Sequence, residues 1–211
     1  MNVKRGAVLA MSVLMFSVSF AVPAGNPQAG REKADDSRCL ECHGASSAGQ
    51  GFSTGSDGKF AKLGGQYPDY IVKQVHDFRS GRRKHEFMAM MAKSISDTDL
   101  ADIAAYFAAE PGMTLGGASA GEDAAAARRL YLHGDAARNV AACAGCHGVD
   151  GRGLAGAAPV IGGQGRRYLA QQLEGWRSGE RSNSAGGVMN LQAKPLSDNE
   201  IEALAQYISA M

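Results

Sequence analysis

Hydrophobic residues recur at intervals of three and four along most of the chain, and no segment shows the convincing alternation that a β-strand needs. This spacing predicts amphipathic helices over residues 68–78, 122–133 and 166–176, with a shorter counterpart of the second in the first half of the chain. Two more helices are predicted to follow Ser96 and Ser197, because each serine has an acidic residue three positions on, as at a capped helix N-terminus. The sequence therefore predicts an all-α fold.

The second half of the chain repeats the pattern of the first, which indicates two related domains. Four blocks recur in the same order: L/I-G-G-Q, Y-[IL]-x-x-Q-[VL], F/W-R-S-G, and a serine–aspartate pair followed by an apolar helix. Residues 111–121 are rich in glycine and small side chains and are predicted to form a linker. The predicted domains are therefore residues 25–110 and 122–211.

The first 24 residues have the features of a secretory signal peptide. Lys4 and Arg5 make a basic start, residues 7–22 carry no charge, and we predict cleavage after Ala24, with Ala21 as the alternative. A retained membrane anchor is the competing interpretation, but the apolar stretch is short for a transmembrane span and serines interrupt it. We therefore expect export to the periplasm.

The charge of the chain argues against nucleic acid as a partner. Removal of residues 1–24 takes away two basic residues and no acidic one, so the formal net charge changes from +1 to −1. Basic side chains gather only in the short run at residues 79–84, which is typical of a solvated loop, whereas nucleic-acid binding requires a concentrated basic surface.

All four cysteines fall into two copies of the motif C-x-x-C-H, one in each half. This motif is the attachment signature of c-type haem. Two thiols on one helical turn reach the two vinyl groups of a porphyrin, and the adjacent histidine lies under the iron as a ligand. The residues concerned are Cys39, Cys42 and His43 in the first copy, and Cys143, Cys146 and His147 in the second. Each domain is therefore predicted to bind one haem c covalently.

Two disulfides or a zinc site are the alternatives for four cysteines in an exported chain. A disulfide framework typically serves a chain that is too small to build a core, and this chain is long enough for two cores. Zinc ligands would have to gather in one place, whereas each C-x-x-C pair lies in its own repeat. Covalent haem is the preferred interpretation.

The second axial ligand decides whether a haem transfers electrons or binds small molecules. In the second domain Met189 is the predicted ligand, because the only other thioether there is the terminal Met211. We expect residues 183–191 to form a loop that can turn Met189 toward the iron. In the first domain Met88 is the predicted ligand, because the repeat aligns it with Met189.

Three side chains near Met88 keep the ligand of the first domain open. Met90 and Met91 align with residues of the second copy that are not haem-iron ligands, so core packing is predicted for both. His85 would give a bis-histidine haem of lower potential, but the second copy has no equivalent histidine.

A backbone carbonyl is predicted to orient each proximal histidine. Pro159 lies where its carbonyl can accept a hydrogen bond from Nδ1–H of His147. Ala61 occupies the equivalent place in the first copy, so any such contact to His43 comes without the rigidity of proline.

Several matched residues have open roles. Arg79 and Arg177 either pair with haem propionates or lie at the surface. Tyr106 and Tyr207 are expected to pack in the closing helices near the domain interface. Residues 151–156 match G-x-G-x-x-G, but a haem motif and not a strand precedes them, so a loop at the haem edge is predicted and not a nucleotide site.

The ordered set of motifs resembles that of the di-haem cytochrome c4 family over essentially the whole mature chain. The set includes the blocks above and M-x-x-x-A-K-x-[IL]-S-D, which contains both predicted methionine ligands. The resemblance implies two class I cytochrome c folds related by pseudo-two-fold symmetry, with haems near the domain interface and His/Met coordination in both. Family members carry a proline before the G-G-Q block, where the first copy here has Ala61.

The resemblance also implies a periplasmic electron carrier and not an enzyme. Its expected partners are redox proteins, with a quinol-oxidising complex as donor and a terminal oxidase as acceptor, and with loose membrane association but no small-molecule substrate. Two alternatives remain, a cytochrome subunit of a dehydrogenase complex and a di-haem enzyme of peroxidase or thiosulfate-oxidising type. An enzyme needs one exchangeable ligand, and the duplicated methionine argues against that.

Overall fold

The computed structural model describes residues 25–44, 58–113 and 122–211. The predicted signal peptide and residues 114–121 of the predicted linker lie outside the described residues. Within the described ranges the regular structure is helical, apart from two isolated β-bridges that join Asp135 to Val140 and Leu154 to Ala158. The predicted all-α fold is confirmed.

The described residues of the first half contain five helices. They are α1 (Pro27–Asp36), α2 (Cys39–His43), α3 (Pro68–Arg79), α4 (Glu86–Ser94) and α5 (Asp97–Ala109). Helix α5 packs against α1 and α3, and α3 also packs against α4. Gly30 permits the close crossing of α1 and α5, because a Cβ atom there would lie 1.9 Å from the carbonyl oxygen of Asp102.

The second half repeats this arrangement. Its elements are α6 (Glu122–His133), the 3₁₀ turn η1 (Ala136–Arg138), α7 (Ala144–His147), α8 (Arg166–Ser178), the 3₁₀ turn η2 (Ala185–Gly187), α9 (Val188–Ala193) and α10 (Asp198–Ser209). Helix α10 packs against α6 and α8, and α8 packs against α9, so α6 to α10 correspond in order to α1 to α5. The predicted helices at 68–78, 122–133 and 166–176 are confirmed to within two residues.

Both predicted serine caps are present. The Ser96 hydroxyl accepts a hydrogen bond from the backbone N–H of Asp99 at 3.1 Å, and Ser197 accepts one from the N–H of Glu200 at 3.3 Å. The Glu200 carboxylate in turn accepts from the N–H of Ser197 at 2.9 Å, which completes a capping box. These caps fix where the closing helices α5 and α10 begin.

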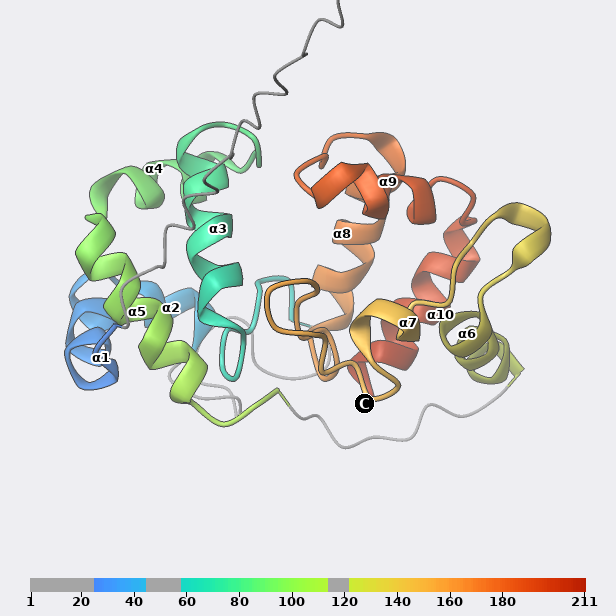
Figure 1. Ribbon diagram of the computed structural model, residues 1–211, viewed down its shortest axis with the longest axis horizontal. Coiled ribbons are helices and arrows are strands. Elements are labelled where there is room, and N and C mark those ends of the chain that lie inside the picture. Colours follow the sequence, from blue (N-terminus) through green and yellow to red (C-terminus); the bar gives the residue numbers. More distant parts are fainter. Residues whose placement is uncertain (1–24, 45–57, 114–121) are drawn as a thin grey trace, which may run out of the picture.

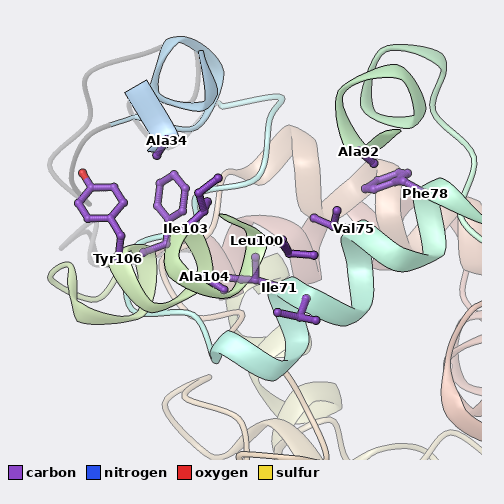
Figure 2. Close-up of a cluster of buried hydrophobic side chains, with 11 residues drawn as sticks. Ala34, Ile71, Val75, Phe78, Ala92, Leu100, Ile103, Ala104 and Tyr106 are labelled. Carbon is purple, nitrogen blue, oxygen red and sulfur yellow. The ribbon is translucent and has the colours of Figure 1, made fainter. Parts of the chain in front are cut away.

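Each half has its own hydrophobic core. The first joins α1, α3, α4 and α5, and Figure 2 shows its side chains, among them Phe78, Leu100 and Ile103. The second joins α6, α8 and α10 and includes Leu130, Leu169, Ile201 and Leu204. In Figure 1 helices α3 and α8 are the inner helices of the two halves, while α1 and α6 lie at opposite ends.

Tyr106 and Tyr207 lie in the closing helices as predicted, but the prediction that they lie near the domain interface is wrong. Tyr106 packs in the first core beside Ala34 of α1 (Figure 2), and the ring of Tyr207 lies 5.5 Å from that of Tyr131 in α6. The closing helices turn these faces toward the outermost helices α1 and α6, away from the domain interface. No helix among the described residues is long and apolar enough to cross a membrane.

Candidate functional site

One cavity of 1070 Å³ is lined by residues of both halves and by both C-x-x-C-H motifs. Its walls include apolar side chains of α3 and α5 in the first half and of α8 and α10 in the second: Ile71, Val75, Leu100, Ile103, Leu169, Leu173, Leu204 and Ile208. A pocket for one drug-sized ligand has about 300–1,000 Å³. The cavity is therefore at the upper end of this range, and it brings together two complete sets of the predicted attachment residues.

Short helices present the two motifs. Helix α2 ends at His43 and α7 ends at His147, and in each case the next residue is a glycine with φ near +75° (Gly44, 75°; Gly148, 78°). A residue with a Cβ atom is strained in this left-handed region, so the glycine ends the helix immediately after the histidine. The sequence C-x-x-C-H-G thus places the thiols and the imidazole on one turn.

The imidazoles are held as predicted. Nδ1 of His147 lies 3.0 Å from the carbonyl oxygen of Pro159, and Nδ1 of His43 lies 2.7 Å from that of Ala61, so alanine provides the same acceptor as proline. Burial lowers the pKa of both histidines. Each ring is therefore neutral at pH 7, donates from Nδ1 and keeps a lone pair on Nε2 for a metal.

None of the four cysteines forms a disulfide, and all four line the cavity. Burial raises the pKa of Cys39 and of Cys143 to about 11, so both are protonated at neutral pH. Among the described residues no three His, Cys, Asp or Glu side chains converge as a metal-ligand cluster. This geometry supports two separate attachment sites over a shared zinc site.

Met88 and Met189 reach the cavity from equivalent helices, α4 and α9. Of the alternatives in the first half, Met90 is 58% exposed and does not line the cavity, whereas Met91 does line it. The structure therefore disfavours Met90 as a ligand, and position in the cavity alone does not separate Met88 from Met91. The repeat does, since Met88 and not Met91 is the counterpart of Met189.

The loop expected at residues 183–191 is shorter than predicted, because α9 already begins at Val188 and Met189 lies on its first turn. The N–H of Met189 donates to the hydroxyl of Ser184 at 3.2 Å. In the first half the N–H of Met88 donates to Nδ1 of His85 at 3.3 Å. His85 is thus the N-cap of α4, and it also lines the cavity.

Arg79 and Arg177 do not line the cavity, so the structure contradicts a propionate role for them. Arg79 binds Asp97 at the start of α5, and Arg177 binds Asp198 at the start of α10. Arg79 also donates to the carbonyl of Ile95 at 2.6 Å, and Arg177 to that of Leu196 at 3.0 Å. Arg79 therefore links the end of α4 to the start of α5, and Arg177 links the end of α9 to the start of α10.

Three arginines of the described residues line the cavity: Arg38 next to the first motif, and Arg83 and Arg181. Arg83 and Arg181 lie at equivalent positions of the repeat, four residues after Arg79 and Arg177. Arg83 donates to the hydroxyl of Tyr168 (3.0 Å) and the side-chain oxygen of Gln172 (2.9 Å) in the second half. Arg181 donates to Tyr70 (3.2 Å) in the first half. Neither arginine was predicted from the sequence, although their equivalent positions in the repeat were the signal that could have found them.

The glycine-rich loop at residues 151–156 follows α7 and not a strand, which agrees with its exclusion as a nucleotide site. Leu154 and Gly156 of this loop line the cavity, as do Ala158 and Pro159 just after it. The loop therefore forms part of the wall around the second C-x-x-C-H motif.

Comparison with known proteins identifies this architecture. The cytochrome c family profile matches the chain twice, at residues 27–109 and 131–211. Cytochrome c4 of Thiocapsa roseopersicina is 40% identical over 193 residues, which cover 90% of this chain and 95% of the relative. The chain belongs to the cytochrome c4 family.

Two further relatives extend this result. The crystal structure of reduced recombinant cytochrome c4 from Pseudomonas stutzeri matches with a TM-score of 0.78 and 34% identity, covering 89% of this chain and 100% of that one. A thiosulfate dehydrogenase electron acceptor of Stutzerimonas stutzeri (strain A1501) is 36% identical over 174 residues, 81% of this chain and 77% of the relative.

Membership of the cytochrome c4 family establishes a di-haem electron-transfer protein with two tandem class I domains, an electron carrier and not an enzyme. Its cofactors are two covalently bound haem c groups, and its partners are redox proteins. The cavity fits these cofactors, because it offers each half two thiols, a neutral imidazole and a thioether on largely apolar walls.

Proposed function

We propose that this cytochrome c4 carries single electrons between respiratory partners in the periplasm, in the direction of a terminal oxidase, with His/Met coordination of both irons. The observation that carries the proposal is the duplicated set of two cysteines, one neutral histidine and one methionine that each half contributes to the same cavity.

Each residue of the set has a distinct role. Cys39 and Cys42 hold the first haem, and Cys143 and Cys146 hold the second, through thioether bonds formed when a thiol adds across a vinyl group. His43 with Met88 would hold the first iron, and His147 with Met189 would hold the second. The bound haem supplies reversible one-electron chemistry. With a histidine and a methionine bound to each iron, the chain would leave no open site for oxygen or peroxide, and the thioethers would favour a high reduction potential.

Arg83 and Arg181 would face the haem propionates. Both line the cavity, and both hydrogen-bond neutral tyrosine, glutamine or asparagine oxygens. A buried cation is costly unless anions compensate it, and within the chain the Asp77 carboxylate contributes to this compensation at Arg83. The haem carboxylates are the anions that the cofactor itself would bring to this part of the cavity.

The processing of the chain belongs to the same proposal. We infer that the signal peptide is cleaved after Ala24 and that the mature protein has a first domain at residues 25–110, a linker at 111–121 and a second domain at 122–211. Loose membrane association of the mature protein is part of the same proposal. Intact-mass measurement of the exported protein should give the mass of residues 25–211 plus two haems. A mass that retains residues 1–24 would contradict cleavage.

The reaction with an oxidase tests the function. The reduced holoprotein, mixed with a solubilised terminal oxidase under oxygen, should be reoxidised at a rate that depends on the concentration of both proteins and changes with ionic strength. Turnover with peroxide in the absence of any partner protein, or no reoxidation by the oxidase, would contradict a carrier that feeds it.

A second candidate is the role of electron acceptor for a thiosulfate dehydrogenase, because the relative from Stutzerimonas stutzeri (strain A1501) carries that name. Oxidised holoprotein mixed with a thiosulfate dehydrogenase and thiosulfate should then be reduced faster than the enzyme reduces an unrelated class I cytochrome c. Equal rates would leave the oxidase-directed role as the sole proposal.

A further inference from the structure

Two glutamines each hydrogen-bond the backbone of the opposite half of the chain. Gln66 ends the L-G-G-Q block of the first half, and Gln164 ends the I-G-G-Q block of the second. The carboxamide of Gln164 accepts from the N–H of Lys62 at 2.8 Å and donates to its carbonyl at 3.0 Å. Gln66 does the same to Val160, at 3.0 Å and 2.8 Å. Both glutamines are 4% exposed.

Hydrogen bonds within each domain hold the G-G-Q segment that carries each glutamine. The N–H of Gly65 donates to the carbonyl of Phe107 in α5, and that of Gly163 to Ile208 in α10. Each glutamine oxygen also accepts the N–H of the following residue, at 3.1 Å from Tyr67 and at 3.0 Å from Gly165. A carboxamide oxygen has two lone pairs, so both are used and the orientation of the amide is fixed.

Lys62 and Val160, which the glutamines bind, directly follow the residues whose carbonyls accept from the proximal histidines. Ala61 C=O and Lys62 N–H belong to one peptide group, whose oxygen lies 2.7 Å from Nδ1 of His43 and whose N–H donates to Gln164. In the second half, the peptide group between Pro159 and Val160 lies in the same way between His147 and Gln66 of the first half.

We propose that Gln164 is a positioning residue for His43 and that Gln66 is one for His147, so that each haem is tuned by a side chain of the opposite domain. The inference rests on the proposed ligation of iron by the two histidines. A peptide group that donates a hydrogen bond becomes a stronger acceptor at its oxygen, because hydrogen bonds in a chain polarise one another. The stronger acceptor gives the imidazole more anionic character, which favours ferric iron.

The direction of the effect follows. Gln164→Leu removes the acceptor of the Lys62 N–H, weakens the bond between Ala61 and His43, and should raise the reduction potential of the first haem. We expect the equilibrium constant for reduction of that haem to change about threefold, which is about 28 mV for a one-electron couple. Gln66→Leu is the mirror variant and should act on the second haem.

Histidine Nδ1–H signals report the contact directly. The ferrous holoprotein labelled with ¹⁵N-histidine should show two such signals, assigned by nuclear Overhauser contacts within each domain. Gln164→Leu should move the signal of His43 and leave that of His147 in place, and Gln66→Leu should do the reverse. Spectroelectrochemical titration of the same samples should show the matching potential shifts.

Two controls separate this role from a structural one. Tyr67→Phe removes another bond between the halves, from the tyrosine hydroxyl to the carbonyl of Arg152 at 3.0 Å, and should move neither histidine signal. Gln164→Met fills the same space with an unbranched chain and should reproduce the shift if Gln164→Leu fails to fold.

The proposal fails if a glutamine substitution does not act selectively on the histidine of the opposite domain. If Gln164→Leu or Gln164→Met moved the His147 signal as much as that of His43, or moved neither, the crossed contact would have no role in tuning. Failure of the iron ligation would look different. The wild-type protein would then lack the shifted Nδ1–H signal of an iron-bound histidine in one domain before any substitution is made.

Discussion

At the scale of single residues, Arg83 and Arg181 place two positive charges at the cavity between the halves. Arg83 and Arg181 are held between the two halves by neutral tyrosine, glutamine and asparagine side chains. Each guanidinium also stacks on an aromatic ring. The Cζ atom of Arg83 lies 4.7 Å from the ring centre of Phe78, and that of Arg181 lies 4.2 Å from the ring centre of Trp176. A fixed positive charge beside a haem opposes the gain of positive charge on oxidation.

Substitution of Arg83 by Gln should therefore lower the reduction potential of at least one haem by about 50 mV, the equivalent of roughly 1 kcal/mol. Spectroelectrochemical titration of the purified holoprotein measures this directly. Arg79→Gln is the matched control, because Arg79 is paired with Asp97 outside the cavity and should shift the potential much less. Equal shifts in the two variants would contradict the propionate assignment.

The methionines of α4 give a second prediction at this scale. Met88→Ala should remove half of the weak red absorption band that methionine gives with ferric iron, and should let carbon monoxide bind one ferrous haem. Met90→Ala should change neither, because the Met90 side chain is 58% exposed and does not line the cavity. The opposite result, or loss of the band only in Met91→Ala, would move the ligand to another residue.

Single residues were also where the sequence was most informative. The two C-x-x-C-H motifs have a spacing set by porphyrin chemistry, and the position of Pro159 after the second motif was enough to predict its hydrogen bond with His147. Arg79 ends α3, Arg83 lies four residues further on, and both recur in the repeat. Nothing in local sequence separates them, because the direction of each side chain depends on how α4 packs.

At the scale of elements, the closing helix α10 is fastened to η1 by a bidentate pair. Arg138 donates to both carboxylate oxygens of Glu200, at 2.9 Å and 2.6 Å. The hydrogen bonds from Arg138 lower the pKa of Glu200 to about 2, against the opposing effect of burial. A carboxyl group with a lowered pKa stabilises the fold above its unfolded pKa, near 4.3, and this stabilisation is lost as pH falls toward 2.

Glu200→Gln should reduce the free energy of unfolding by about 1–2 kcal/mol at pH 7, a value that allows for solvent screening of this partly exposed pair. The difference from the wild-type protein should shrink below about pH 4.3 and vanish near pH 2. Urea titrations of both holoproteins from pH 2 to 7 measure it. Glu202→Gln, which removes the exposed pair with Arg166, should have little effect, and a pH-independent loss in Glu200→Gln would contradict this mechanism.

Element boundaries show what sequence periodicity can predict. The long helices α3, α6 and α8 were found because they span at least 12 residues. Helix α9 has six residues and follows Gly186 and Gly187, which have positive φ, so its segment was predicted to be a loop. Packing of α9 against α8 stabilises a helix too short for its own sequence to specify.

At the scale of the whole molecule, two apolar cores meet through a polar interface. The contacts between the halves are made by glutamine, arginine and tyrosine side chains and by backbone groups. The repeat in the sequence predicted two similar domains, but hydrogen bonds such as that from Tyr67 to Arg152 join residues 85 positions apart and leave no local pattern. The pairing of these hydrogen bonds about a pseudo-two-fold axis becomes apparent only in the folded structure.

The absorption spectrum of the exported holoprotein, quantified per haem and repeated with carbon monoxide after reduction, tests the central claim most directly. Ligation of both irons by histidine and methionine predicts a red methionine band of two-haem intensity and no spectral change with carbon monoxide. A band of half that intensity, or a carbon monoxide complex at one haem, would contradict closed coordination at both irons and make that haem a candidate catalytic site.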